Sequence, residues 1–140
     1  MLIYSNYINT INKMETTNTN QTIKQVFNLM KYAFVIVPIV AGADKFTNIL
    51  THWDQYINPT LAKVLPFSTS VFMMIVGVIE IIAGIIVFKK PEIGGYIVAA
   101  WLTAIALSLL VNFNYVDVAV RDLVMALSAF SMARLSKVVA

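Results

Sequence analysis

The chain has 140 residues, of which 59% are hydrophobic and 12% are charged, and its mean hydropathy is +0.79. Soluble domains are about 25% charged, so this composition excludes an ordinary soluble fold and predicts a single-domain helical membrane protein. The net charge is +3, and the basic residues flank apolar runs rather than clustering, so we expect the lipid bilayer as a partner and no nucleic acid. The chain has no cysteine, which excludes disulfides and thiol chemistry, and with one histidine we expect no metal site.

The first 22 residues are polar and rich in Asn and Thr, and they lack the basic and apolar regions of a signal peptide. We therefore expect residues 1–22 to form a disordered, cytoplasmic tail that precedes a membrane domain at residues 23–140. Met14 is a second candidate start, and the sequence does not choose between it and Met1.

The first membrane helix is predicted at residues 23–50. Its charge-free part, residues 32–43, holds 12 residues. At the rise of an α-helix this part spans only about 18 Å, whereas the hydrocarbon core of a bilayer is about 30 Å thick. The helix must therefore carry Lys31 near one interface and Asp44 with Lys45 near the other.

The second membrane helix is predicted at residues 66–88, and Glu80 is its only charge. Gly77, Glu80 and Gly84 are spaced i, i+3 and i+7, so they share one helix face. Small residues let another helix approach closely, and a lone carboxylate facing lipid is costly. We therefore expect Glu80 to face other protein segments.

The third and fourth membrane helices are predicted at residues 93–112 and 115–135. Residues 93–116 contain no charge, which makes the third helix the clearest span. The charge-free part of the fourth helix, residues 123–133, holds 11 residues and spans about 16 Å. Asp117, Arg121 and Asp122 must therefore enter the membrane zone or its edge.

Four spans place both termini on the same side of the membrane. Seven Lys and Arg residues lie on that side and three lie on the other, so the positive-inside tendency predicts that both termini are cytoplasmic. The predicted fold is an all-α polytopic membrane protein, a four-transmembrane-helix bundle.

Six charged residues would then form one polar cluster in or near the membrane: Asp44, Lys45, Glu80, Asp117, Arg121 and Asp122. The cluster has two interpretations. It is a pocket that binds a small head group or relays protons, or it is a set of ion pairs that hold the helices together. Asp117 lies one turn before Arg121, at a spacing that suits either an ion pair or a cap of the helix start. A direct Glu80–Arg121 pair requires staggered or tilted helices.

Three stretches of the chain resemble the DoxX family of small membrane proteins. The segment AGADKF at residues 41–46 resembles the family's Gly-x-x-Lys segment, GVIEIIAG at residues 77–84 resembles its Gly-x-x-Glu-x-x-x-Gly segment, and VRD at residues 120–122 resembles its Arg-Asp pair. The stretches follow the family's order across residues 27–135. The chain departs from the family at Lys31, where Arg is frequent, and at Ile36, where Gly is frequent.

The resemblance implies a multi-pass protein of the bacterial inner membrane that serves as an accessory or assembly subunit of a quinone-linked oxidoreductase complex. Its polar centre would be Lys45, Glu80, Arg121 and Asp122, its partners would be other membrane subunits or further copies of itself, and we expect no enzymatic activity from the chain alone. No cofactor is expected within the chain, apart from a quinone as a candidate ligand. The alternative functions are a small-ligand binding protein of the quinone type and a small transporter or proton conductor.

Overall fold

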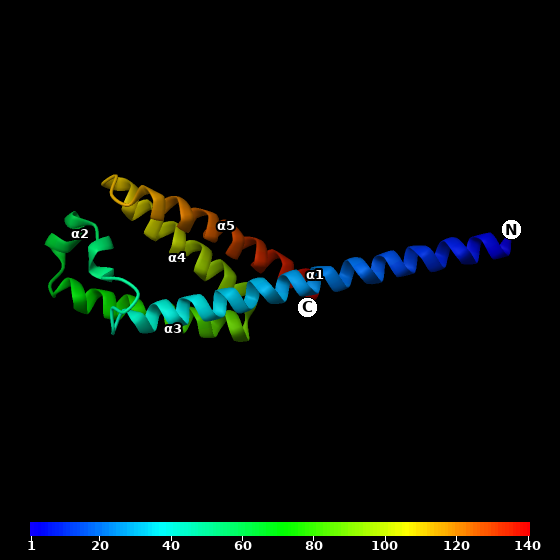
Figure 1. The fold of residues 1–140 in the computed structure, drawn as a ribbon, viewed down its shortest axis with the longest axis horizontal. Helices are drawn as coiled ribbons and strands as arrows, with labels where there is room; N and C mark the ends of the chain where they lie inside the picture. The colour runs from blue at the N-terminus through cyan, green and yellow to red at the C-terminus, as the bar shows by residue number, and fades with distance from the viewer.

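The computed structural model describes all residues from Met1 to Ala140, and every regular element in it is a helix. Four of the helices are long and lie alongside one another, while two short ones belong to a connecting segment at one end (Figure 1). In chain order the elements are α1 (Leu2–Asp44), the 3-10 helix η1 (Trp53–Tyr56), α2 (Pro59–Val64), α3 (Thr69–Lys89), α4 (Pro91–Val111) and α5 (Val116–Val139).

The long helices pack in a ring, in which α1 contacts α3 and α5, and α4 contacts α3 and α5. The centre of the ring is filled mainly by small or medium side chains, such as Ala83, Val87, Val98 and Ala129. Many large apolar side chains point outward instead, as Leu127 does on α5. This inside-out distribution is typical of helices whose outer surface is covered by lipid.

Three of the long helices, α1, α3 and α4, are long and apolar enough to cross a membrane. The three predicted membrane helices at residues 23–50, 66–88 and 93–112 correspond to these elements. The helix α5, with 24 residues, is slightly longer than α3 and α4, which have 21 each. It is more polar than those two, because it carries Asp117, Arg121 and Asp122 near its start and basic residues near its end. Length and apolarity therefore identify a membrane protein with three candidate spans.

The glycines of α3 lie against α1, as their shared face predicts. A Cβ atom added at Gly77 would meet the backbone oxygen of Gly42 at 2.5 Å, and one added at Gly42 would meet the Gly77 oxygen at the same distance. A Cβ atom added at Gly84 would meet the Ile39 side chain at 2.7 Å and the Val35 backbone oxygen at 2.9 Å. The two backbones therefore touch where no side chain intervenes, and this close approach confirms that the Glu80 face is turned toward protein.

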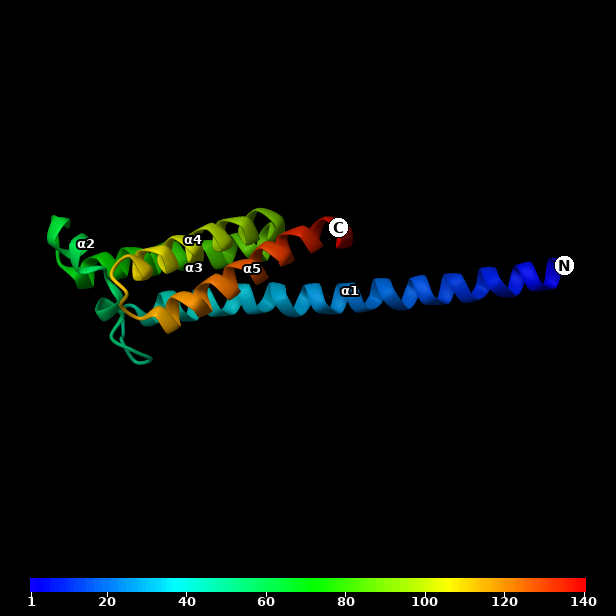
Figure 2. The ribbon, with the colours of Figure 1, turned by 90° about the horizontal axis from the view of Figure 1, so that it is seen from above.

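The N-terminal tail is helical rather than disordered. The helix α1 runs without interruption from Leu2, so residues 2–22 project beyond the bundle as a continuation of the first membrane helix (Figure 2). This stretch contains no Gly or Pro, and threonine side chains such as Thr10 and Thr16 close onto the carbonyls four residues earlier. The hydroxyl groups of these threonines are therefore satisfied within the helix itself.

The first helix also ends earlier than predicted, at Asp44 rather than at residue 50. Asn48 then takes a left-handed backbone conformation, with φ of 51°. The chain turns back at this point, and the connecting segment that includes η1 packs on α3.

Candidate functional site

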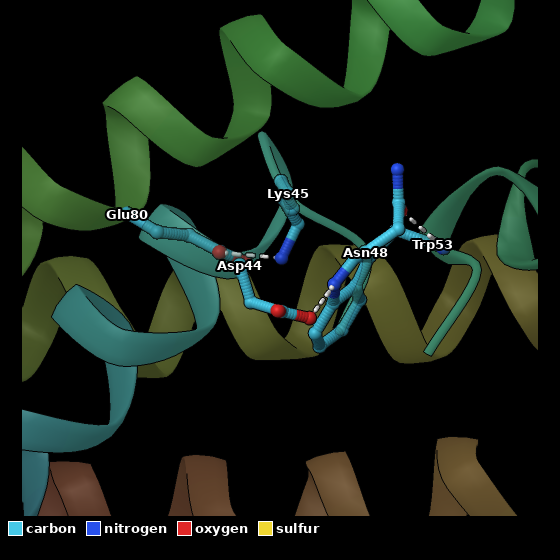
Figure 3. A network of polar contacts seen from close by, with 5 residues as sticks. All are labelled: Asp44, Lys45, Asn48, Trp53 and Glu80. Atoms are coloured by element: carbon cyan, nitrogen blue, oxygen red, sulfur yellow. Dashed lines mark hydrogen bonds and ion pairs between the residues drawn. The ribbon is translucent and has the colours of Figure 1, made fainter. Parts of the chain in front are cut away.

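The centre of the polar cluster is an ion pair between α1 and α3. The Nζ atom of Lys45, directly after the last residue of α1, donates to Oε2 of Glu80 at 2.6 Å (Figure 3). The two side chains are 4% and 13% exposed, respectively. The Gly42–Gly77 contact lies three residues before each partner and brings the helices close enough for a short, buried pair.

The indole ring of Trp53 covers the other side of the Lys45 ammonium. The Nζ atom lies 3.7 Å from the ring centroid. A cation held over an indole face is attracted by the ring quadrupole, and the attraction grows when water is excluded. The ammonium therefore has a carboxylate on one side and an aromatic face on the other, and both are protein groups.

Asp44 organises the segment that carries Trp53. Its Oδ1 atom accepts from the Thr47 hydroxyl and the Ile49 N–H, both at 2.9 Å. Its Oδ2 atom accepts from the Leu50 N–H at 3.0 Å and from the Trp53 indole N–H at 2.8 Å. Four donors on one carboxylate use its acceptor capacity, so Asp44 acts as an anchor for the connecting segment rather than as a free acid or base.

The early end of α1 leaves the backbone N–H groups that follow it without helical hydrogen-bond partners. Lys45 is level with Glu80, midway along α3, so α1 ends well before the far end of α3 (Figure 1). Non-helical backbone at this depth needs partners for its free N–H groups. The Asp44 carboxylate supplies them to Ile49 and Leu50.

The structure removes Asp117 and Arg121 from the cluster. Arg121 donates to Asp117 at 2.8 Å within α5, and their side chains are 69% and 73% exposed. The Glu80–Arg121 pair considered from the sequence does not form, because Lys45 occupies the Glu80 carboxylate. The capping alternative for Asp117 is also wrong, because the residue before α5 is Tyr115 and no side chain caps that helix.

Asp122 is the one acidic residue of α5 that belongs near the centre. It is half-buried, forms no ion pair, and lies within electrostatic range of its neighbour Arg121 as well as of Glu80 and Lys45. The structure thus pairs Lys45 with Glu80 directly, connects Asp44 to this pair through Trp53, and adds Asp122 at longer range.

Two tryptophans complete the site, and their roles were missed by sequence reasoning. Trp53, from the connecting segment, bridges Asp44 and Lys45. Trp101, from the middle of α4, has a buried indole N–H that lies beside the Glu80 carboxylate without completing a hydrogen bond. The position of Trp101 in the sequence could have indicated this role, because tryptophans in membrane proteins favour the interfaces and Trp101 lies in the middle of its helix.

The site is closed around its charges. Cavities of about 380 Å³ and 330 Å³ lie elsewhere, and neither is lined by Lys45 or Glu80. No three His, Asp or Glu side chains are grouped so as to hold a metal ion. Lys45 and Glu80 neutralise each other's charge, and the contacts of Trp53 with Asp44 and Lys45 fix the connecting segment.

No protein-family model matches this chain, and no curated protein or solved structure is significantly similar to it.

Proposed function

We propose that this chain is a DoxX-like accessory subunit of the bacterial inner membrane, in which the intramembrane charges hold the fold together. The observation that supports this most is the buried Lys45–Glu80 pair, which is enclosed by Trp53 and leaves neither charge free. Breaking a buried pair leaves an uncompensated charge, so such a pair fixes the relative position of its two helices. Of the two interpretations of the cluster, this geometry favours the structural one.

The proposed topology has four spans, with α5 as the fourth. The helix α5 has 24 residues, follows α4 through a short turn and packs along its length. Large apolar side chains on α5 are exposed on the bundle's outside: Val120, Val124, Leu127, Phe130 and Val138. Such an apolar outer surface is suited to contact with lipid, and the polar start of α5 would lie at the edge of the membrane.

Both termini belong on the cytoplasmic side in this proposal. The C-terminus and the N-terminal half of α1 leave the bundle at the same end (Figure 2). The excess of Lys and Arg at that end favours the cytoplasm. The opposite end, with the connecting segment and the α4–α5 turn, would then face outward.

An accessory role is supported by the projecting part of α1. Residues 2–22 extend past the bundle (Figure 1). They carry exposed apolar side chains such as Tyr4, Tyr7 and Met14. A partner subunit of an oxidoreductase complex would contact this helix and would carry the redox chemistry, including any quinone. A ligand pocket lined by Glu80 and Arg121 has no support, because the two side chains are engaged separately.

The test is native mass spectrometry of the protein extracted from its own membrane in mild detergent. We expect a stoichiometric complex with a larger membrane protein, and removal of residues 1–13 should reduce its yield. A protein that leaves the membrane only as a protomer or homo-oligomer would contradict the accessory role. A quinone-sized mass retained on the isolated chain would favour ligand binding instead.

A further inference from the structure

An apolar stripe runs along the part of α1 that projects beyond the bundle. Helical spacing places six apolar residues of this part on one side of the helix: Ile3, Tyr4, Tyr7, Ile8, Ile11 and Met14. The other side is polar and includes Asn9 and Lys13. The helix here extends past the bundle (Figure 2), so Tyr4, Tyr7 and Met14 stay exposed.

This stripe is continuous with the outward side of the membrane part of α1. Residues 18 apart in an α-helix point in the same direction, because about five full turns separate them. Ile11 is therefore in line with Leu29, and Met14 is in line with Tyr32. Leu29 and Tyr32 are both exposed on the outside of the bundle. The stripe and these two residues together form one surface, the outer face of α1.

The outer face of α1 points away from the chain's own bundle. Phe27 and Phe34 are buried in the core, and they lie in line with Asn9 and Thr16 on the polar side of the projecting helix. The other helices of the chain therefore pack on the side opposite to the stripe. Most of the stability of a protein helix comes from packing of its apolar side, so the outer face needs an occupant from outside the chain.

The surface of the bilayer does not fit as this occupant. The helix α1 runs from Leu2 into the membrane part without a Gly or Pro before Pro38, so the stripe leaves the membrane along the axis of the span. Helices that lie on a membrane surface are rich in Lys and Arg on their polar side. Residues 2–22 contain one such residue, Lys13.

A second copy of the chain fits the stripe by its spacing. Tyr4, Tyr7, Ile11 and Met14 are separated by three, four and three residues, which is the spacing of the contact line in a pair of parallel helices. Asn18 takes the next position, where a single asparagine favours pairing in register. Two copies inserted in the same orientation hold their projecting helices parallel and at the same height. Each stripe residue would then meet its own counterpart.

The area of the stripe is also adequate for a specific contact. Tyr4 and Tyr7 are 71% and 63% exposed. Aromatic side chains bury about 150–250 Å² each when fully covered, so the four partly exposed tyrosines of a pair would bury about 400–700 Å². A specific interface buries at least about 1,200 Å² in total, and the tyrosines supply a third or more of that area. Ile11, Met14 and Leu29 of each copy add to it.

We propose that two copies of this chain pair through the outer face of α1, with their helices parallel and in register from Tyr4 to Met14. The proposal does not rest on the accessory role, because the polar side of the projecting helix and the other helices of the bundle stay open to a larger subunit. An accessory subunit that pairs in this way enters its complex as two copies.

The test uses single cysteines in the full chain, which has none of its own. Isolated membranes that contain Ile11→Cys or the matched control Asn9→Cys are oxidised, and disulfide-linked dimer is measured by non-reducing electrophoresis. The control lies in line with the buried Phe27, on the far side of the helix. We expect about tenfold more dimer from Ile11→Cys, because a disulfide requires the two Cβ atoms to lie within about 3.5–4.5 Å.

A second variant pair separates pairing from chance collision. Tyr7→Asp added to Met14→Cys places two like charges in the contact and should remove most of the linked dimer, whereas Asn9→Asp added to Met14→Cys should leave it unchanged. All these positions lie outside the bundle, so its fold is retained and is checked by near-UV circular dichroism.

Equal linking at positions 9 and 11, or no effect of Tyr7→Asp, would overturn the pairing. Linking of Ile11→Cys to a larger protein instead would assign the outer face to that subunit, which overturns the pairing and supports the accessory role. A fluorophore at Ile11→Cys that is quenched by a quencher within the lipid would place the stripe on the bilayer and also overturn it. Linked dimer without any larger subunit would support the pairing and contradict the accessory role.

Discussion

Replacement of Glu80 by Gln separates a structural ion pair from a ligand site. Removing one partner of a buried pair costs about 3–5 kcal/mol, because the other charge stays buried and unpaired. Here Gln keeps an oxygen for Lys45, and Trp53 still covers the ammonium at 3.7 Å. The retained hydrogen bond to a charged group is worth about 1.5–3 kcal/mol, so we expect a net loss of about 2 kcal/mol.

This loss should lower the thermal midpoint in detergent by about 5–10 °C, measured by near-UV circular dichroism. The matched control is Glu92→Gln, which breaks the exposed Lys137–Glu92 pair, whose side chains are 49% and 44% exposed. Exposed pairs contribute about 0–1 kcal/mol, so the control should move the midpoint by less than about 3 °C. Equal shifts in both variants, or a higher midpoint for Glu80→Gln, would refute the structural role of the pair.

Three further predictions test the same network through thermal stability in detergent. The double variant Lys45→Met with Glu80→Met should regain most of the stability that either single variant loses, because apolar replacement of a whole buried pair is often neutral or stabilising; additive losses would contradict this. The variant Asp44→Ala should lose about 3 kcal/mol or more of the free energy of unfolding, since four donors lose their acceptor. It should also expose Trp53 to a soluble fluorescence quencher. Unchanged quenching would mean that the carboxylate does not hold the connecting segment. The variant Arg121→Gln should change stability by less than about 0.5 kcal/mol, because its pair with a neighbouring residue of α5 is exposed; a large loss would return Arg121 to the cluster.

The early end of α1 decides which segment covers the first half of α3. Because α1 ends level with the middle of α3, a non-helical segment covers the remaining part of α3. That segment is tolerated because its donors reach Asp44 and its Trp53 ring lies on Lys45. Asp44 and Lys45 therefore both hold the connecting segment, Asp44 through hydrogen bonds and Lys45 through its contact with the Trp53 ring.

The sequence alone determined the class of the protein and one of its packing faces. Long apolar runs with few charges specify membrane helices, because no soluble fold of this size can bury them. The spacing of Gly77, Glu80 and Gly84 specified a face turned toward protein, because helix periodicity is a local property and small residues admit a neighbouring backbone. These inferences needed no knowledge of how the helices are arranged.

Only the tertiary structure decided which charges meet. The choice of Lys45 over Arg121 as the partner of Glu80 depends on the depth at which α1 ends, and that depth is set by Asp44 capturing donors that follow it in the chain. The placement of Trp101 beside Glu80 likewise depends on the relative height of α4. Residue spacing fixes positions around and along one helix. The register between helices is fixed instead by the contacts and turns that join them. This register decides whether the charged residues form a closed ion pair or line an open pocket.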